Sequence, residues 1–318
     1  NQAKRIILAR RLSHHVEDHN LVPRMQFGSC PGKNCHSAVL QKVLSHEIVR
    51  ITKQTAAFME NDAVSCYDRL MNNVLLLILL CLGVPSTVTS SMGKIWDQTV
   101  HHIKTIYGTS TSTYSSTPDL PLFGPGQGST CGPIFWLLCF CLIVDSFDSN
   151  LATAIFTSVT MDVVVRTLGT AFVDDSSLSV TSTYQQDKDL DMGSNATLEN
   201  KEVILSLTTI AQHWERLLFT TGGAINMQKS FWYLIAWVWT NGVPKLVTTK
   251  AAPGTMELTS GSSKSPTTVP RLDPTDSFRT LGVYLSPSGS QTKQTNILRQ
   301  YAEQYQSNVT NATLTPDE

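Results

Sequence analysis

The chain has 318 residues, of which 41% are hydrophobic and 15% are charged, and its formal net charge is −1. This size and composition are those of a globular protein with one large domain or two smaller ones around a substantial core. The near-neutral charge argues against a strongly basic nucleic-acid-binding protein, and the apolar runs at residues 74–82 and 134–144 are too short to span a membrane.

The first half of the chain predicts helices interrupted by one short strand. We expect, in chain order, a helix at 1–20, a Gly/Pro loop at 25–34, a helix at 37–53, a strand at 55–64, and helices at 68–82 and 86–107. Gly83 and Pro85 follow the third of these helices, as residues that commonly end a helix. Residues 109–132 are rich in glycine and hydroxyl side chains, which predicts a loop.

The second half predicts strands in hairpins rather than regular alternation of strand and helix. We expect, in chain order, an apolar helix at 134–147, strands at 163–172 and 178–180 around a tight turn, a polar loop at 185–200, a helix at 205–219, an aromatic packed strand at 231–240, a long loop at 250–275 and a strand at 278–285. The remaining residues are polar and predict an irregular tail. Together these elements indicate an α+β fold.

The cysteines and the start of the chain give two further expectations. The seven cysteines follow no disulfide framework and no secretory signal is seen, so we expect an intracellular protein with reduced thiols, in the nucleus or the cytoplasm. Cys30, Cys35 and His36 resemble part of a zinc site but lack a second ligand pair at a suitable spacing. Because the chain begins at Asn1 with sequence typical of an interior segment, we expect it to be a fragment.

Acidic residues follow two of the predicted strands. Asp174 and Asp175 come directly after an apolar run, and Asp62 follows the strand at 55–64. Asp is common in turns, and Asp68 could cap the helix that follows it, so each acid also has an ordinary structural explanation. If the two strand ends lie side by side, however, three carboxylates converge and require cations to balance their repulsion. Two Mg2+ ions would do so, and paired ions of this kind serve phosphoryl transfer.

A glycine-rich segment lies at 123–133, F-G-P-G-Q-G-S-T-C-G-P, and three interpretations of it are possible. A dinucleotide-binding loop would need a preceding central strand, but two prolines precede it, and we expect no dinucleotide cofactor. It is otherwise a plain flexible loop, or a backbone surface that lets a nucleic-acid strand approach closely, with Gln127 forming hydrogen bonds.

The order of these motifs resembles the palm of reverse transcriptases, most closely those of non-LTR retroelements, over about residues 20–285. The motifs are, in order, Q-F-G-S-C-P-G-K-N, N-D-A-V-S-C-Y-D, G-P-G-Q-G, F-V-D-D, G-G-x-x-N-x-x-K and L-G. The resemblance implies a polymerase palm with partial fingers: the fingers–palm join at 1–54, the palm at 55–245, and a polar loop, a primer-grip-like strand and the C-terminal tail at 246–318.

Site residues are carried over position by position from this resemblance. It implies metal-binding carboxylates and a general acid at Asp62, Asp174, Asp175 and Lys229. It implies contacts to nucleotide or template, including an aromatic gate against the ribose 2′-hydroxyl, at Tyr67, Gln127, Gly128, Phe172 and Lys33. It implies a primer-grip-like hairpin at Leu281 and Gly282. Without the resemblance, Lys229 is equally explained as a solvated turn lysine and Tyr67 as a core residue.

The resemblance implies an RNA-directed DNA polymerase that extends a DNA primer on an RNA template with dNTPs, using two Mg2+ ions or Mn2+, and that is not bound to a membrane. An alternative is an RNA-dependent RNA polymerase palm, against which Tyr67 argues. Another is a degenerate palm that only binds nucleic acid. The upstream fingers, thumb and endonuclease of the family are not recognised, and Cys66 and Cys131 depart from its usual residues. We therefore expect a fragment with an intact site that lacks parts needed for activity.

Overall fold

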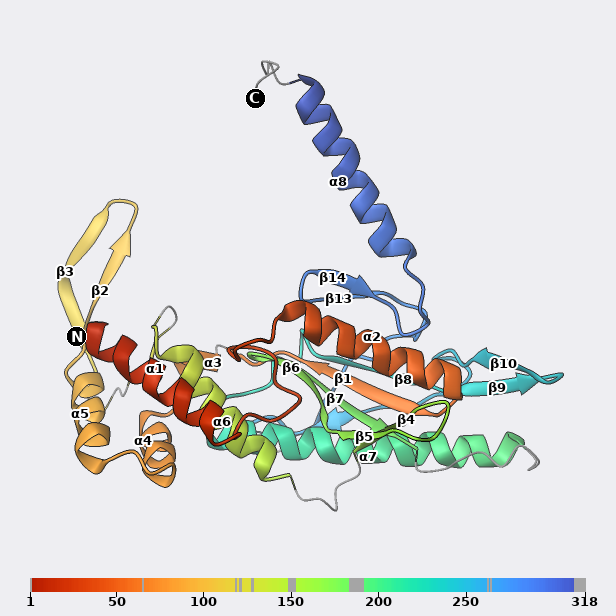
Figure 1. The fold of residues 1–318 in the computed structure, drawn as a ribbon, viewed down its shortest axis with the longest axis horizontal. Coiled ribbons are helices and arrows are strands. Elements are labelled where there is room, and N and C mark those ends of the chain that lie inside the picture. Colours follow the sequence, from red (N-terminus) through yellow and green to blue (C-terminus); the bar gives the residue numbers. More distant parts are fainter. Residues whose placement is uncertain are drawn as a thin grey trace.

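The computed structural model describes residues 2–64, 66–117, 119, 122–126, 129–147, 153–182, 192–261, 263 and 265–311. It confirms an α+β fold, centred on a four-stranded antiparallel sheet of order β6-β7-β1-β8 (Figure 1). These strands are β6 (Gly169–Phe172), β7 (Asp175–Thr181), β1 (Ala56–Asn61) and β8 (Phe231–Ile235). No helix in the described part of the chain is long and apolar enough to cross a membrane.

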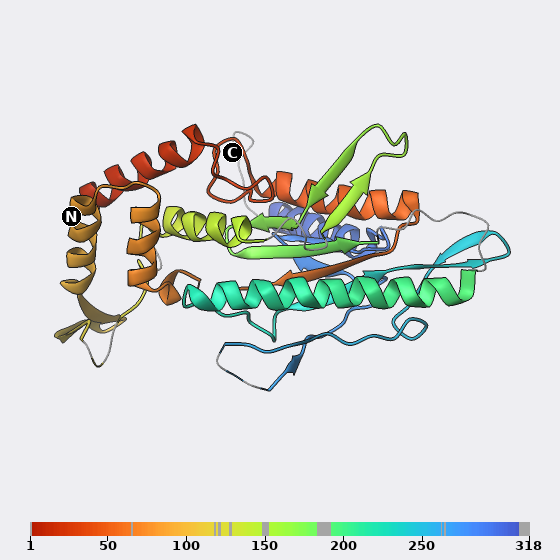
Figure 2. The same ribbon diagram turned by 90° about the horizontal axis from the view of Figure 1, so that it is seen from below.

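Helices cover both faces of the sheet. Helix α2 (Cys35–Thr52) lies on one face, and α7 (Met192–Thr220) runs the length of the other, as Figures 1 and 2 show. Helix α6 (Gly132–Asp145) is buried on almost every side, which explains why its sequence is apolar throughout. Proline in its first turn suits a helix start, because the first N–H groups have no partner within the helix.

The alternation of side chains along β1 divides the core in two. Ala57 and Met59 point into the larger cluster, which includes α6 and α7. Ala56 and Phe58 point into a smaller cluster against α2, where Phe58 stacks on Tyr233 of β8 with 5.3 Å between ring centroids. Because both faces are covered, β1 is buried at every position and shows no polar face.

The remaining elements lie around this centre. The helices are α1 (Gln2–Asp18), α3 (Cys66–Arg69), α4 (Asn72–Cys81), α5 (Ser86–Asp97) and α8 (Thr292–Asn311). The remaining strands form antiparallel pairs: β2 (Val100–Thr105) with β3 (Gly108–Ser115), β4 (Ala154–Thr157) with β5 (Val164–Thr167), β9 (Trp237–Thr240) with β10 (Val243–Leu246), β11 (Glu257–Leu258) with β12 (Thr267–Thr268), and β13 (Phe278–Thr280) with β14 (Val283–Leu285).

The structure corrects two predictions in the first half of the chain. The helix expected at 68–82 is two helices, α3 and α4, that meet near Leu70 and Met71. The helix expected at 86–107 ends at Asp97, and residues 100–115 form the β2–β3 hairpin instead of a helix end and a loop. Residues 100–115 contain many β-branched residues, which favour extended structure. The apolar spacing of the first part of this segment also fits a helix.

The second half brings further corrections. Residues 192–200, expected within a loop, belong to α7, and the polar tail includes helix α8. The expected strand at 278–285 is a hairpin, because Leu281 and Gly282 both adopt positive φ angles (48° and 89°) at its turn. The aromatic strand at 231–240 is confirmed as packed, but Ala236 divides it into β8 and β9. Strands β4 and β10 were not anticipated, and the long loop expected at 250–275 contains the short pair β11 and β12.

Candidate active site

The register of the central strands brings two of the predicted acids together. Strands β1 and β7 pair so that Asn61 lies opposite Ser176. Asp62 directly follows Asn61, and Asp175 directly precedes Ser176. The two acids are therefore adjacent at the same end of the β1–β7 pairing. Facing residues of antiparallel strands have Cα atoms about 5 Å apart. Asp174 lies in the two-residue turn that joins β6 to β7, where Phe172 pairs with Asp175.

The electrostatics around this turn reflect the crowding of negative charge. The pKa of Asp175 is raised, first by partial burial and then by Asp174, with smaller effects from Asp62 and Glu60 that Lys42 partly offsets. The pKa of the Tyr67 hydroxyl is raised to about 12, first by burial and then by Cys66 and Asp174. Like charges held close together disfavour ionisation, which is the effect that a bound cation would reverse.

Cys66 also lies beside Asp174. Burial is the main reason that the pKa of its thiol is raised, and the charge of Asp174 and a hydrogen bond to it raise that pKa further. The Cys66 thiol therefore stays protonated and forms a hydrogen bond with the Asp174 carboxylate.

Asp62 is held by the loop between α7 and β8. Its Oδ2 accepts a hydrogen bond of 3.2 Å from Asn226 Nδ2 and lies 3.6 Å from Lys229 Nζ. Its backbone oxygen accepts a hydrogen bond of 2.8 Å from the Asn226 amide. Lys229 is 70% exposed, so its attraction to Asp62 is weak and its ammonium remains accessible. Asn226 had no predicted role, although it occupies the N of the G-G-x-x-N-x-x-K motif.

The three carboxylates do not surround a common point. Among the described residues, no three His, Cys, Asp or Glu side chains converge closely enough to hold a metal ion, and this includes Cys30, Cys35 and His36. Asp62 instead turns one carboxylate oxygen toward Asn226 and Lys229. The oxygen donors of Asp62, Asp174 and Asp175 are nevertheless the type that Mg2+ prefers, and after burial the charge of Asp174 is the largest cause of the raised pKa of Asp175.

Tyr67 packs against the glycine-rich segment. A Cβ atom on Gly124 would lie 2.0 Å from the Tyr67 backbone oxygen, and one on Gly132 would lie 3.4 Å from the Tyr67 ring. Gly124 also has a φ of 77°, so a side chain there would be both strained and obstructed. Gln127 and Gly128, predicted to position template and nucleotide, lie outside the described residues.

Lys33 is bonded within its own loop. Its ammonium donates hydrogen bonds to the backbone oxygens of Gln26 (2.8 Å) and Arg24 (3.4 Å), and lies 5.2 Å from the centre of the Phe27 ring. Two of its three N–H groups are thus used to shape the loop before α2. The predicted contact of Lys33 with phosphate stays a prediction, and it would use the third N–H group of the ammonium.

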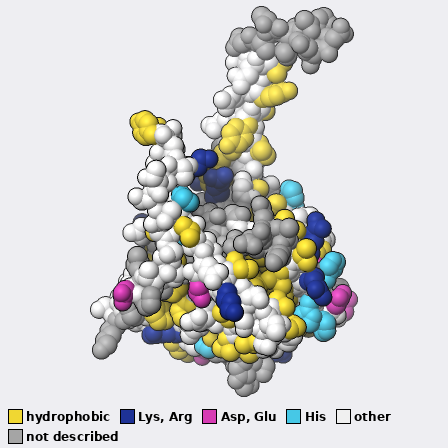
Figure 3. Space-filling model, turned by 90° about the vertical axis from the view of Figure 1, so that its left-hand side faces the viewer, with side chains coloured by type: hydrophobic (Ala, Val, Ile, Leu, Met, Phe, Trp, Pro, Cys, Tyr) yellow, Lys and Arg dark blue, Asp and Glu magenta, His cyan; other side chains and the backbone are white. Residues whose placement is uncertain are grey.

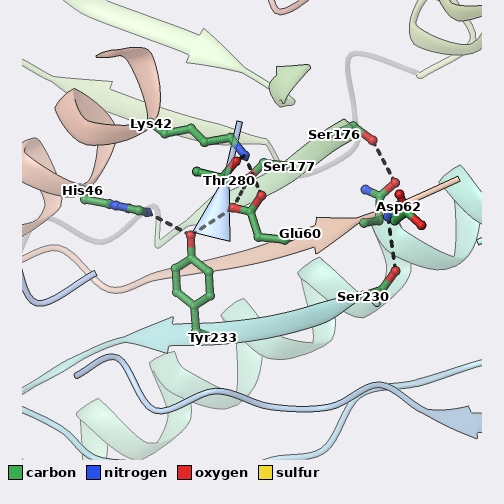
Figure 4. A network of polar contacts seen from close by, with 10 residues as sticks. Lys42, His46, Glu60, Asp62, Ser176, Ser177, Ser230, Tyr233 and Thr280 are labelled. Atoms are coloured by element: carbon green, nitrogen blue, oxygen red, sulfur yellow. Dashed lines mark hydrogen bonds and ion pairs between the residues drawn. The ribbon is translucent and has the colours of Figure 1, made fainter. Parts of the chain in front are cut away.

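A buried polar network lies behind the site, on the α2 face of the sheet. The carboxylate of Glu60 accepts hydrogen bonds from Lys42 Nζ (2.6 Å), Ser177 Oγ (3.0 Å) and the Tyr233 hydroxyl (3.2 Å). Figure 4 shows Lys42 and His46 of α2 reaching toward Glu60 of β1 and Tyr233 of β8. Since the Tyr233 hydroxyl donates to Glu60, its oxygen is left to accept from His46 Nε2, 2.9 Å away.

The predicted primer-grip hairpin is tied into the same network. Lys42 Nζ donates a hydrogen bond of 3.0 Å to Thr280 Oγ1, and Thr280 is the last residue of β13, directly before the turn at Leu281 and Gly282. The structure thus connects this hairpin to β1 through one lysine of α2. It does not test the predicted contact of Leu281 and Gly282 with a primer.

Comparison with known proteins gives only structural matches. No family model and no curated protein matches this chain. Telomerase from Candida albicans, in complex with a fragment of telomeric RNA, is 14% identical with a TM-score of 0.44, over 75% of this chain and 35% of that one. Telomerase from Candida tropicalis, truncated from its C-terminal domain, is 11% identical with a TM-score of 0.45, over 90% of this chain and 44% of that one. This chain spans less than half the length of either.

Proposed function

We propose that this chain is the palm of an RNA-directed DNA polymerase, which extends a DNA primer on an RNA template. One observation carries the proposal: the register of β1 and β7 makes Asp62 and Asp175 neighbours, and Asp174 lies in the adjoining turn. Acids at the ends of adjacent buried strands, balanced only in part by Lys42 and Lys229, are poorly explained by stability alone, because their mutual repulsion opposes folding.

Each residue then has a task that its surroundings support. Asp62, Asp174 and Asp175 would hold two Mg2+ or Mn2+ ions, which when bound stabilise the attacking and leaving oxygens of phosphoryl transfer. Asn226 orients the Asp62 carboxylate by its hydrogen bond. Lys229, exposed and beside Asp62, can donate a proton to the departing pyrophosphate.

The region around Tyr67 and helix α1 supports a nucleic-acid substrate. Tyr67 lies next to the glycine-rich segment, where its ring can limit space at the sugar of an incoming nucleotide. Arg10 and Arg11 are exposed on α1, which carries several further basic and histidine residues. On the end of the molecule shown in Figure 3, acidic side chains are sparse among the basic and apolar ones. Such a surface suits phosphate contacts despite the net charge of the whole chain.

One observation favours a second candidate, a palm that binds nucleic acid without catalysis. Asp62 faces Asn226 and Lys229, so metal binding would require this side chain to be shared or turned. In that case, the chain would retain its affinity for a primer–template while incorporating no nucleotide.

The test is Mg2+-dependent incorporation of dTTP on a poly(rA)–oligo(dT) primer–template, with the longest form of the protein that contains these residues. We expect Asp174→Asn to reduce incorporation at least about 100-fold, as loss of transition-state charge stabilisation does in other enzymes. Asp162→Asn is the matched control, because Asp162 is exposed in the turn between β4 and β5 and forms hydrogen bonds with near neighbours in the chain, Ser158, Thr160 and Val163.

Three outcomes separate the candidates. Full incorporation by Asp174→Asn would contradict the proposal. Primer–template binding without incorporation in the unmodified protein would favour the non-catalytic palm. Equal use of UTP and dTTP would point to an RNA-dependent RNA polymerase, because Tyr67 then would not exclude the 2′-hydroxyl.

A further inference from the structure

The turn that carries Asp174 has an unfavourable backbone. Val173, the other residue of this turn, adopts a φ of 60°. Left-handed conformations are rare for residues with a β-branched side chain, because Cβ and its substituents crowd the backbone. Conformations of this kind persist only where the surrounding structure enforces them. The contacts around Val173 identify what enforces this one.

The side chain of Gln26 holds both polar backbone groups of Val173. The Val173 N–H donates to Gln26 Oε1 at 3.0 Å, and Gln26 Nε2 donates to the Val173 oxygen at 3.1 Å. The two residues are 147 positions apart, and Gln26 is completely buried. The side-chain amide of Gln26 therefore pairs with Val173 as the backbone of a neighbouring strand would, just beyond the end of β6.

The backbone around Gln26 aligns it with the turn. The Ala171 N–H donates to the Met25 oxygen at 2.7 Å, and the Phe27 N–H donates to the Ala171 oxygen at 2.8 Å. Residues 25–27 thus run along β6 as a short parallel partner, and the Gln26 side chain continues this pairing to Val173. Gly28 closes the contact, because a Cβ atom there would lie 2.2 Å from the Val173 nitrogen.

A second element holds the same turn from another side. Trp136 Nε1 of α6 donates a hydrogen bond of 2.7 Å to the Val173 oxygen, which therefore accepts from two side chains. Trp136 is itself 1% exposed, so its indole cannot move away without disturbing the core. Helix α6 begins at the glycine-rich segment, and the loop before α2 contains Gln26. Side chains from α6 and from the loop before α2 thus meet at the turn.

We propose that Gln26 is a positioning residue, which together with Trp136 fixes the Val173–Asp174 turn so that Asp174 is presented to the metal site. The metal-binding part of this statement rests on the proposed function. The clamp itself does not, because it is defined by contacts within the chain. Gln26 touches no reacting group, and it reaches Asp174 through the backbone of Val173. Its Oε1 also accepts a hydrogen bond of 2.8 Å from the Gly28 N–H, which holds the amide in place within its own loop.

Hydrogen exchange of the Val173 amide tests the clamp in the full chain, without substrate. We expect Gln26→Met, which keeps the length of the side chain but removes its hydrogen bonds, to speed exchange of this amide about tenfold or more. Gln54→Met is the matched control. Gln54 Nε2 also donates to two backbone oxygens, those of Ile155 (3.3 Å) and Ser182 (2.8 Å), but at the opposite end of the sheet. It should leave exchange at Val173 unchanged.

Binding of Mn2+, followed by electron paramagnetic resonance, tests the consequence for the site. We expect Gln26→Met to weaken Mn2+ binding about tenfold and Gln54→Met to leave it unchanged. Adding Val173→Asn to Gln26→Met should restore much of the affinity, since Asn adopts positive φ more readily than Val. A purely structural role for Gln26 would not be rescued in this way, because Val173→Asn also removes apolar packing.

The outcomes are separable. Unchanged Val173 exchange in a folded Gln26→Met protein would overturn the clamp. If Gln26→Met does not fold, Trp136→Phe replaces it as the variant, with a several-fold loss of Mn2+ affinity expected and an unchanged affinity overturning the proposal. If the unmodified chain binds no Mn2+, the metal site of the proposed function fails and the positioning role with it, while Val173 exchange still decides whether the clamp exists.

Discussion

At the scale of single residues, the Lys42–Glu60 ion pair shows how the carboxylate of Glu60 is tolerated behind the site. Glu60 is 8% exposed, and Lys42, Ser177 and Tyr233 all donate to its two oxygens. A buried charge of this kind is stable only while its partners remain, so loss of any donor leaves an incompletely paired carboxylate. Because Glu60 lies two residues before Asp62, the network also fixes the end of β1 that carries Asp62.

His46 makes this network sensitive to acid. Its pKa is lowered from 6.5 to about 3, first by complete burial and then by the nearby charges of Lys42 and Arg50. Between these two pH values the unfolded chain binds a proton at His46 that the folded chain does not. Acid therefore favours unfolding, and this stability is fully present above pH 6.5.

We expect the free energy of unfolding to fall by about 1.4 kcal/mol per pH unit below pH 6.5 from this one proton. Urea unfolding of the unmodified protein and of His46→Gln at pH 7, 6 and 5 measures it. Gln keeps a donor for the Tyr233 hydroxyl but does not titrate. The free energy of unfolding of His46→Gln should therefore fall less steeply with acid, by about 1.4 kcal/mol per pH unit. Parallel curves for the two proteins would show that His46 is not the acid-sensitive group.

At the scale of elements, the β6–β7 hairpin depends on close approach of its two strands. A Cβ atom on Gly169 would lie 1.7 Å from the backbone oxygen of Ser177 and 3.1 Å from Leu178 Cα. The obstructing atoms are backbone, so no rotation of a side chain can relieve the clash. Gly169 thus permits the pairing that places Phe172 opposite Asp175.

We expect Gly169→Ala to lower the free energy of unfolding by about 2–4 kcal/mol, as other overpacked or backbone-strained positions do. Gly93→Ala in α5 is the control, because its Cβ would meet only the flexible Leu76 side chain, at 3.1 Å. There, the higher helix propensity of Ala offsets the contact and leaves stability nearly unchanged. Chemical denaturation of both variants measures the difference, and equal stability would show that the hairpin can separate without cost.

At the scale of the whole molecule, the core and the C-terminal helix behave as separate parts. Helix α8 projects away from the body in Figure 1. It is attached near its start, where the Tyr284 N–H donates to Gln294 Oε1 at 2.8 Å and Lys293 Nζ lies 4.4 Å from the centre of the Tyr284 ring. Beyond Ile297 its described side chains are exposed, including Leu298 (57%) and Tyr301 (66%).

We therefore expect a chain that ends after Ile297 to keep the free energy of unfolding within about 0.5 kcal/mol of the unmodified value, because the residues removed contribute little burial. A chain that ends after Thr292 also loses the contacts of Lys293 and Gln294 and should be measurably less stable. Thermal unfolding of both forms tests this. A large loss in the first form would mean that α8 packs on the body in solution.

The sequence by itself determined the elements whose pattern is local. Helices α1, α2 and α6, the buried strand β1 and the turn before Asp175 follow from apolar spacing and turn chemistry, which depend on neighbouring residues. At 86–107 the pattern fits both a helix and extended structure, so the expected helix continues past its observed end at Asp97. The tail was expected to be irregular because most of its residues are polar, although Leu298, Tyr301, Tyr305 and Val309 recur at helical spacing along α8.

Only the tertiary structure decided which groups meet. The register that makes Asp62 a neighbour of Asp175, the grip of Asn226 on Asp62, and the hold of Gln26 on Val173 join positions more than 100 residues apart in the chain. A glutamine that bonds a backbone group has no local signature, because its partner is any peptide unit that folding brings near. The residue types of the candidate site could therefore be named from the sequence, whereas the contacts between them exist only once the chain has folded.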